Sequence, residues 1–548
     1  PTASGKTMCY NLPVLNEILA NPAARALYLF PTKALSQDQV AELHELSEEL
    51  DVDIRSYVYD GDTPATLRPV IREAGHIVVT NPDMLHTGIL PHHTKWVRLF
   101  ENLKYVVIDE LHTYRGVFGS HVANVLRRLR RLCEFYGSKP QFLCSSATIA
   151  NPKQLAERLT GEEVTLIDDN GAPQGEKHFI FYNPPVVSDD GLREPVLKAG
   201  RRIAGKFLRR GVQTIVFARS RLATEVLLTY LQEDLATGAR GITNKRAADI
   251  RGYRGGYLPS ERRAIERGLR EGSILGVVST NALELGIDIG RLDACVMVGY
   301  PGTIAATWQQ AGRAGRRHGT SVAVLVASNG PLDQYIVQHP DYFFGQSPEH
   351  GLINPDNLMI LVSHMKCAAF ELPFRDGEAF GIDAAGTAEI LGYLQDEKIV
   401  RWAGGQWHWM SENFPAEDIS LRSAGGENFV IVDTTEPQHK VIGEMDRVSA
   451  MTMLHTHAIY IHEGQQYLVD KLDWDERRAW VHKVDVDYYT DANLAVTIKV
   501  LDAFKQDAEG ALQKQFGDVM TAAKATIFKK VKPYTHENIR WGEIHLPK

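Results

Sequence analysis

Short runs of consecutive apolar residues alternate with longer amphipathic segments over the first 330 residues of the chain. Continuous Val, Ile and Leu runs of this length are typical of strands buried on both faces of a parallel sheet. The predicted strands are Arg25–Phe30, His76–Thr80, Tyr105–Asp109, Gln141–Cys144, Thr214–Ala218, Ile274–Ser279, Ala294–Gly299 and Ser321–Val326. Segments such as Ser36–Leu50 and His121–Tyr136 are predicted to be crossover helices. The pattern therefore predicts an α/β fold with two tandem doubly wound domains.

The pattern changes after about residue 330. Gly386–Gln395 has helical spacing, and Ile399–Trp409 predicts a hairpin that turns at Gly404 and Gly405. A helix followed by an aromatic hairpin predicts a winged-helix-like domain. The Trp402–Trp409 hairpin is a candidate contact for a nucleic-acid strand, and packing of its tryptophans onto their own domain is an equally good interpretation.

The remaining sequence predicts a β-rich C-terminal module. Short alternating segments between residues 423 and 501, such as Asn428–Asp433 and Gln466–Val469, indicate strands. After residue 501 the spacing predicts helix, which ends in a basic cluster of Lys529, Lys530 and Lys532. With a polar linker at 168–176, the expected domains are 1–168, 176–330, 331–415 and 416–548.

Composition narrows the class of protein. Of the 548 residues, 44% are hydrophobic and 23% are charged, and no apolar run approaches the roughly 20 residues that span a bilayer. We therefore expect no membrane partner. Five cysteines occur without a CxxC pair, which favours a reducing cytoplasm and predicts no zinc site in this stretch. The net charge of −8 excludes a passive nucleic-acid coat, but it suits a motor that must release its track.

The first seven residues, PTASGKT, match the latter part of a phosphate-binding loop. Small residues let backbone N–H groups reach phosphate oxygens, so Thr2, Ala3, Ser4 and Gly5 are expected to cradle ATP. Lys6 would place its charge on the β- and γ-phosphates, and the Thr7 hydroxyl would ligate Mg²⁺.

An apolar strand ends in two carboxylates at YVVIDELH, as a Walker B site does. Asp109 is expected to hold Mg²⁺, and Glu110 to orient and polarise the attacking water. The SSAT stretch follows the next strand, and its hydroxyl residues, among them Ser146 and Thr148, are expected to sense the state of the Walker B segment.

The sequence QQAGRAGR provides a basic, glycine-containing segment in the second domain. Arg313 and Arg316 are candidate arginine fingers that would stabilise charge developing on the γ-phosphate. Gln309 is expected to take part in nucleotide binding, and His112 to relay between the ATP site and Gln309.

With these residues the chain resembles superfamily 2 helicases of the DExH type, because the whole motif series appears in order. Motifs I, Ia, Ib, II, III, IV, V and VI are Pro1–Thr7, Phe30–Gln39, Thr80–Leu85, Asp109–His112, Ser145–Thr148, Thr214–Arg221, Ser279–Gly290 and Gln309–Arg316. The resemblance implies two RecA-like domains, with ATP and Mg²⁺ bound in the cleft between them. It also implies that Asp288 contacts the ribose or an arginine finger.

Two stretches, Asp109–Gly137 and HPDYFF at 339–344, resemble the MrfA/YprA-type helicases, relatives of a RecQ-like group associated with DNA repair. That resemblance implies 3′→5′ movement on single-stranded DNA and repair of crosslinked or damaged DNA. The family has sequence before motif I and continues into a C-terminal domain with four zinc-binding cysteines. We therefore expect this chain to be a fragment, and zinc only in the missing C-terminal region.

The track should cross both domains opposite the ATP cleft. Hydroxyls, amides and basic groups suit sequence-independent phosphate contacts. The expected contacts are Thr32, Lys33, Thr80, Asn81, Arg219, Arg221 and Thr280. We expect a monomeric cytoplasmic motor of a bacterium or archaeon, bound to single-stranded or forked DNA. An RNA helicase, or a remodelling translocase that does not separate strands, would share every motor motif.

A further candidate is the histidine group His455, His457 and His462. Its HxHxxxxH spacing has no matching carboxylate or cysteine, so a half-exposed strand is the favoured interpretation over a metal site.

Overall fold

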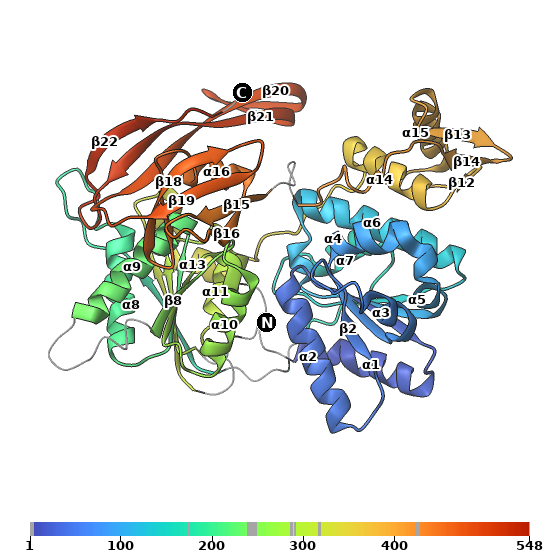
Figure 1. Ribbon diagram of the computed structural model, residues 1–548, viewed down its shortest axis with the longest axis horizontal. Helices are drawn as coiled ribbons and strands as arrows, with labels where there is room; N and C mark the ends of the chain where they lie inside the picture. The colour runs from blue at the N-terminus through green and yellow to red at the C-terminus, as the bar shows by residue number, and fades with distance from the viewer. Residues whose placement is uncertain are drawn as a thin grey trace.

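The computed structural model describes residues 5–169, 171, 175–237, 249–284, 289, 292–315, 319–422 and 428–546. Two parallel sheets covered by helices lie side by side, and each carries a smaller module on its upper edge in Figure 1. The two predicted RecA-like α/β units, the winged helix and the β-rich C-terminal part are therefore confirmed as the fold class.

The first sheet, called domain 1, has five parallel strands in the order β2-β3-β1-β4-β5. Its strands are β1 (Arg25–Leu29), β2 (Ser56–Val58), β3 (Ile77–Thr80), β4 (Leu103–Ile108) and β5 (Gln141–Cys144). Its helices are α1 (Lys6–Ala20), α2 (Lys33–Glu49), α3 (Arg68–Ala74), α4 (Pro82–Met84), α5 (Val97–Asn102), α6 (Gly116–Phe135) and α7 (Pro152–Thr160). The apolar runs predicted four of these strands. The three-residue β2 was missed, because its segment contains a single aliphatic residue.

The second sheet, called domain 2, has six strands in the order β6-β11-β10-β7-β9-β8. They are β6 (Lys177–Tyr182), β7 (Thr214–Ala218), β8 (Ile250–Tyr253), β9 (Gly276–Ser279), β10 (Ala294–Val298) and β11 (Ser321–Val326). The helices are α8 (Val196–Arg209), α9 (Arg221–Thr237), α10 (Pro259–Arg270), α11 (Ile304–Ala311), α12 (Pro331–Gln338) and α13 (Pro340–Gly345). The two strands that the sequence missed, β6 and β8, form the two edges, where polar residues interrupt the apolar pattern.

The winged-helix domain consists of α14 (Leu358–Glu371), α15 (Ala384–Asp396) and a small antiparallel sheet. Its strands are β12 (Phe374–Arg375), β13 (Val400–Ala403) and β14 (Gln406–Trp409), in the order β12-β14-β13. The predicted turn is confirmed, since Gly404 and Gly405 have φ values of 59° and 80°. Only glycine adopts such values without steric cost, which explains the pair.

The β-rich module begins with a five-stranded sheet and ends with a long three-stranded one. The first contains β15 (Asn428–Asp433), β16 (Lys440–Asp446), β17 (Ile459–His462), β18 (Gln465–Asp473) and β19 (Arg478–Lys483), with α16 (Arg447–Met453) between β16 and β17. The second contains β20 (Tyr489–Glu509), β21 (Leu512–Val531) and β22 (Asn538–Glu543).

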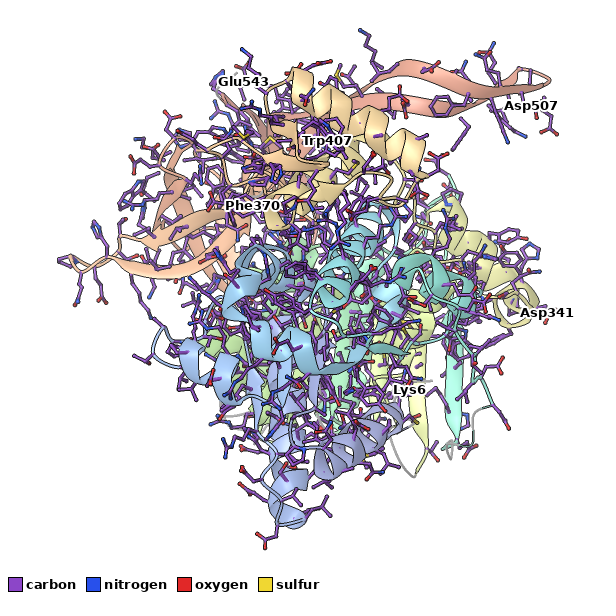
Figure 2. All side chains as sticks on the ribbon, turned by 90° about the vertical axis from the view of Figure 1, so that its right-hand side faces the viewer. Lys6, Asp341, Phe370, Trp407, Asp507 and Glu543 are labelled. Carbon is purple, nitrogen blue, oxygen red and sulfur yellow. The ribbon has the colours of Figure 1, made fainter. Side chains whose placement is uncertain are left out.

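The helix predicted after residue 501 was wrong. β20 and β21 form an antiparallel hairpin that turns at Gly510, and Figure 2 shows Asp507 near its tip, away from the body of the molecule. Ala, Lys and Gln in this stretch favour helix locally. Pairing along both strands, together with the alternating Leu494, Val496 and Ile498, outweighs that preference.

Candidate functional site: an ATP site between two motor domains

The phosphate-binding segment enters α1 through Gly5, whose φ of 74° is left-handed. Among the described residues other than its chain neighbours, no atom lies within 4 Å of the place where a side chain on Gly5 would begin, which leaves room for a ligand beside its backbone. Lys6 is the first residue of α1, and its Nζ donates to the backbone carbonyl of Ser146 at 3.0 Å. Motifs I and III therefore meet. Thr2, Ala3 and Ser4 lie outside the described residues.

Asp109 lies just beyond the end of β4, where it is partly buried. Ser145 Oγ donates to Asp109 Oδ1, and so does the backbone N–H of Glu110 at 2.8 Å. Burial, and next the neighbouring Glu110 carboxylate, raise the pKa of Asp109, while Ser145 and Lys6 act in the opposite direction. A buried carboxylate beside a lysine fits a site for Mg²⁺ bound to a nucleotide.

Tyr10 joins three motifs that are far apart in the sequence. Its hydroxyl lies 2.9 Å from Gln39 Oε1 in motif Ia and 3.2 Å from Asp109 Oδ2 in motif II. The pKa of Tyr10 is raised first by burial and then by Asp109, while the neighbouring Thr7 acts in the opposite direction. Tyr10 was missed in the sequence, although its position four residues after Lys6 places both on one face of α1.

Glu110 and His112 occupy a strained turn after β4. Glu110 has φ 51° and ψ 44°, a left-handed conformation that non-glycine residues rarely adopt and that clusters at functional sites. Burial, followed by the charges of Lys6 and Arg115, lowers the pKa of His112 to about 3, so the imidazole is neutral. The 3.4 Å separation of Glu110 Oε2 from His112 Nδ1 is therefore a contact and not an ion pair.

The tautomer of His112 follows from its neighbours. The backbone N–H of Ala147 donates to His112 Nδ1 at 3.2 Å, which leaves the proton on Nε2. Within the described part of the chain, His112 Nε2 and Gln309 Nε2 are both buried without a hydrogen-bond partner. Both of these groups are donors and cannot bond to each other as they stand, so the relay between His112 and Gln309 stays a prediction.

Motif VI packs against motif V in domain 2. Arg313 Nη2 donates to the backbone carbonyl of Glu284 at 2.7 Å, and Gln310 Nε2 donates to Glu284 Oε2 at 3.0 Å. Arg313 is 1% exposed, so here it braces motif V. Burial raises the pKa of Glu284, while the hydrogen bond from Gln310 and then the charges of Arg313 and of Arg115, in domain 1, act in the opposite direction. Arg316 and Asp288 lie outside the described residues.

Among the expected track contacts of domain 1, Thr32 and Lys33 lie at the surface. Thr32 caps α2 by accepting from Leu35 N, and Lys33 Nζ lies 3.0 Å from Asp62 Oδ2. Thr80 is fully buried and donates to the carbonyl of Tyr59 at 2.6 Å, so it cannot meet a phosphate in this conformation.

The remaining track candidates have structural partners of their own. Asn81 is 6% exposed and caps α4 by accepting from Met84 N at 2.9 Å. Arg221 Nη2 lies 2.9 Å from Asp446 Oδ2, so it joins domain 2 to the β-rich module. Thr280 accepts weakly from Ala282 N at 3.4 Å. Arg219 is the most open of the set, with a side chain 61% exposed and 3.8 Å from Asp333.

The three candidate histidines lie in different environments. His455 is buried against the ring of Phe528, His457 is exposed, and only His462 belongs to a strand, at the end of β17. The favoured half-exposed strand was therefore wrong: His455 and His457 lie outside strands, and His462 lies on a strand but is buried. No group of three or more His, Cys, Asp or Glu able to hold a metal occurs in the described ranges.

The tryptophans of the predicted hairpin divide into two environments. Trp407 and Trp409 pack against the core of the winged-helix domain. Trp402 is 39% exposed, and its ring centroid lies 5.1 Å from that of Trp407. Trp402 is therefore the more accessible stacking surface.

Sequence comparison places the chain in a family. The model of the DEAD/DEAH box helicases matches residues 1–155, the helicase conserved C-terminal domain matches 201–318, and the winged-helix domain of ATP-dependent helicase HRQ1 matches 353–424. The chain is thus a superfamily 2 ATP-dependent helicase.

The particular branch follows from individual relatives. The chain is 62% identical to the ATP-dependent helicase YprA of Bacillus subtilis, over 100% of this chain and 72% of that protein. It is 37% identical to the ATP-dependent helicase HRQ1 of Saccharomyces cerevisiae, over 97% of this chain but only 50% of the yeast protein. The chain belongs to the YprA/MrfA/HRQ1 family of helicases.

Solved structures agree with this assignment. The DUF1998 helicase MrfA bound to DNA has a TM-score of 0.90 and 61% identity, over 100% of this chain and 72% of that one. MrfA bound to DNA and AMPPNP gives the same TM-score at 60% identity, over 100% and 74%. In the described residues, no helix is long and apolar enough to cross a membrane.

Proposed function

We propose that this chain is the motor of an ATP-dependent helicase that acts on single-stranded or forked DNA. The observation that carries the proposal is the meeting of Lys6, the Ser146 carbonyl and Asp109 in one site, which brings motifs I, II and III together. Structures of the relative MrfA bound to DNA, and to DNA with AMPPNP, support DNA as the bound nucleic acid and ATP as the hydrolysed nucleotide.

The residues present fit Mg·ATP. Gly5 and the residues before it would cradle the phosphates, and Lys6 would exchange the Ser146 carbonyl for phosphate oxygens. Asp109 and Thr7 would hold Mg²⁺, which neutralises phosphate charge when bound. Glu110 would orient the attacking water, and Arg316, with Arg313 as the other candidate, would complete the site from domain 2.

We further propose 3′→5′ movement and a role in the repair of crosslinked or damaged DNA. Both follow from the resemblance to the MrfA/YprA-type helicases and not from the geometry of the site. Of the candidate track contacts, Thr32, Lys33 and Arg219 remain the best supported, because their side chains reach the surface. Thr80 and Asn81 would influence track binding only indirectly, by fixing the backbone conformation of motif Ib.

The test is the rate of ATP hydrolysis with single-stranded DNA, duplex, forks and RNA of the same sequence, followed by unwinding of duplexes with a 3′ or a 5′ tail. We expect single-stranded DNA to stimulate hydrolysis and unwinding to require the 3′ tail. Stronger stimulation by RNA would indicate an RNA helicase. DNA-stimulated hydrolysis that displaces bound protein without separating strands would indicate a remodelling translocase, and efficient unwinding from a 5′ tail would refute the polarity.

A further inference from the structure

The chain crosses from domain 2 to domain 1 between α13 and α14, as Figure 1 shows. These residues, 346–357, contain no helix or strand, and we call them the crossing segment. A connection without helix or strand can be a flexible linker that makes few contacts. Its hydrogen bonds show that it is held to both motor domains along its length.

The second half of the crossing segment is fixed to domain 1. Gly351 N donates to Asn151 Oδ1 at 2.7 Å, and Asn151 Nδ2 donates back to Gly351 O at 3.1 Å. Gly116 N, at the start of α6, donates to the carbonyl of Leu352 at 2.7 Å. Further along α6, Ser120 Oγ accepts from Asn354 N, Asn124 Nδ2 donates to Pro355 O, and Arg127 pairs with Asp356. The segment is therefore anchored beside motifs II and III.

The first half of the crossing segment reaches motif VI through one side chain, Glu349. Its carboxylate accepts from the backbone N–H of Ile304 at 2.7 Å and from that of Ala305 at 3.0 Å. Its own backbone carbonyl accepts from Ala150 N, directly after motif III, at 3.3 Å. One residue thus contacts the loop after motif III and the start of the motif VI helix α11.

The chemistry of this contact is specific. The first N–H groups of a helix have no partner within the helix, and the helix dipole favours negative charge there. The side-chain hydroxyl of Thr303, the residue before α11, caps the helix by accepting from Ala306 N at 3.0 Å. Glu349 supplies the acceptors for the two N–H groups before it, and it does so from a segment fixed to the other motor domain.

We propose that Glu349 is a positioning residue for ATP hydrolysis, which fixes the start of α11 relative to motif III. The inference rests on the proposed function. Because α11 is a short helix that leads directly into Gly312 and Arg313, a change at its start re-aims Gln309, Arg313 and the residues that follow. Misplacement of catalytic groups by about 1 Å costs on the order of 100-fold in rate.

The decisive comparison is between Glu349→Ala and Thr303→Ala. Both remove caps from the first turn of α11, but only Glu349 connects that turn to domain 1. We expect Glu349→Ala to lower kcat for ATP roughly 10- to 100-fold, with KM for ATP and the melting temperature nearly unchanged. Thr303→Ala should have a much smaller effect on kcat. Glu349→Gln, which retains one acceptor oxygen, should fall between them, and His350→Ala, at the exposed neighbouring residue, should match the unaltered chain.

Two results would overturn the inference: kcat of Glu349→Ala within twofold of the unaltered chain, or an equal fall in Thr303→Ala. Hydrogen–deuterium exchange of the 303–308 peptide separates this inference from the proposed function. If the unaltered chain hydrolyses no ATP with or without DNA, the proposed function fails. Faster exchange of that peptide in Glu349→Ala would still support the contact, and unchanged exchange would refute it.

Discussion

The winged-helix domain and the β-rich module each meet a motor domain at a fully buried arginine–glutamate pair, but the two pairs are placed differently. Arg128 of α6 in domain 1 pairs with Glu371 of α14, so this pair lies across the contact. Arg254 and Glu225 both belong to domain 2. Their remaining hydrogen-bonding groups reach the module, where Arg254 Nη2 donates to Tyr460 Oη at 3.1 Å and to the carbonyl of Ile461 at 3.0 Å.

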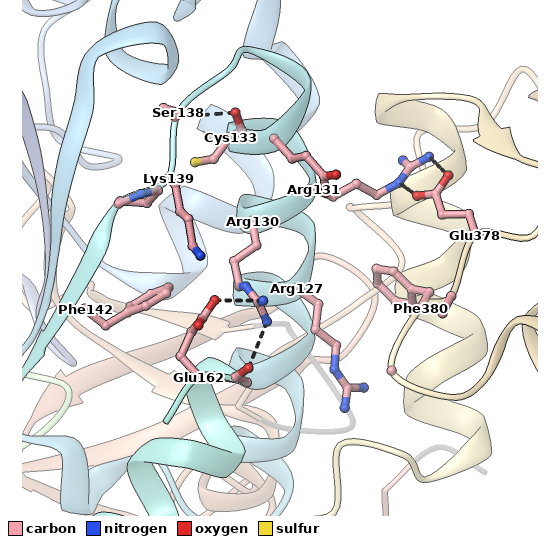
Figure 3. A pocket seen from close by; sticks show the side chains of 15 residues that line it. Arg127, Arg130, Arg131, Cys133, Ser138, Lys139, Phe142, Glu162, Glu378 and Phe380 are labelled. Carbon is pink, nitrogen blue, oxygen red and sulfur yellow. Dashed lines mark hydrogen bonds and ion pairs between the residues drawn. The ribbon is translucent and has the colours of Figure 1, made fainter. Parts of the chain in front are cut away.

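This difference shows which interactions hold each of the two smaller modules to its motor domain. The winged helix completes a charge pair that domain 1 cannot complete alone, and Figure 3 shows a second such pair close by, Arg131 with Glu378. Domain 2 already neutralises its buried arginine before the module docks, and the ion pairs that cross this contact, Arg221 with Asp446 and Arg251 with Glu463, are partly exposed. The first attachment therefore places a fully buried ion pair across the contact, whereas the second combines partly exposed ion pairs with hydrogen bonds offered by a buried pair that domain 2 already holds. Closure of the motor domains would move the two modules relative to one another.

The largest effects are expected from substitutions in the ATP site, where residues of domain 1 can be compared with residues of domain 2. Lys6→Ala and Glu110→Gln in domain 1 should both abolish turnover, but only Lys6→Ala should weaken nucleotide binding, because it removes charge compensation. Arg316→Ala in domain 2 should lower turnover by roughly 10³-fold while nucleotide binding to domain 1 persists. Steady-state hydrolysis and fluorescent nucleotide titration measure these differences. Equal loss of ATP affinity in both domain 1 variants would contradict their assigned roles, and near-normal turnover in Arg316→Ala would move the finger to Arg313.

The next test removes the negative charge from each of the two buried arginine–glutamate pairs. Glu371→Gln and Glu225→Gln should each cost about 3–5 kcal/mol, because each leaves a buried arginine without its counter-charge. Glu371→Gln should release the winged helix to proteolysis with domain 1 intact, whereas Glu225→Gln should lower the melting temperature of domain 2 itself. Glu509→Gln, from an exposed pair with Lys514, is the control and should change neither. Identical proteolysis patterns in the first two variants would remove the distinction between the attachments.

Acid should loosen only the winged-helix contact. Burial is the largest cause of a lowered pKa in His86, where it falls to about 3, and in His93, His121 and His364, all of which lie at this contact. A histidine with a lowered pKa contributes stability above its ordinary value near 6.5, and that stability is lost as the pH falls below it.

At pH 5 the loss reaches about 2 kcal/mol for His86, and protonation would also place positive charge beside Arg128. Hydrogen–deuterium exchange of α14 should therefore rise between pH 7 and 5 while that of β17 and β18 stays constant. His455, whose pKa burial lowers to about 4, packs on Phe528 inside the module and not at its contact with domain 2. Parallel loosening of both contacts would count against this account.

The smallest expected effect concerns the outer face of the winged helix. Trp402→Ala should weaken DNA binding by about 1 kcal/mol, the lower end for stacking of a base on an aromatic ring, without lowering the melting temperature. Trp407→Ala should instead destabilise the domain, because its ring packs on the core. Fluorescence anisotropy with single-stranded DNA, beside thermal melting, measures both. Unchanged DNA affinity in Trp402→Ala would leave this hairpin a purely structural element.

The sequence by itself determined the motor. Continuous apolar runs predicted the central strands, and the motifs predicted that Lys6 and Asp109 would serve one nucleotide site, with the SSAT stretch sensing the Walker B segment. The glycine pair at 404–405 likewise predicted the wing, because the conformation of a tight turn depends on the residues within it. These features are local, or are repeated in every member of the fold class.

The tertiary structure alone decided what depends on distant partners. From the sequence, Thr80 was expected to contact the nucleic-acid track, but in the structure it is buried and bonds to the Tyr59 carbonyl. Nothing in the sequence distinguishes Glu349 from other acidic residues, and its role follows from the contact of the crossing segment with α11. The exposed far half of the β20–β21 hairpin forms because its two strands satisfy each other's backbone groups, against the helical preference of their residues. Hydrogen bonds and charge pairs between segments that are separated in the chain leave no periodicity in the sequence, and only folding brings their partners together.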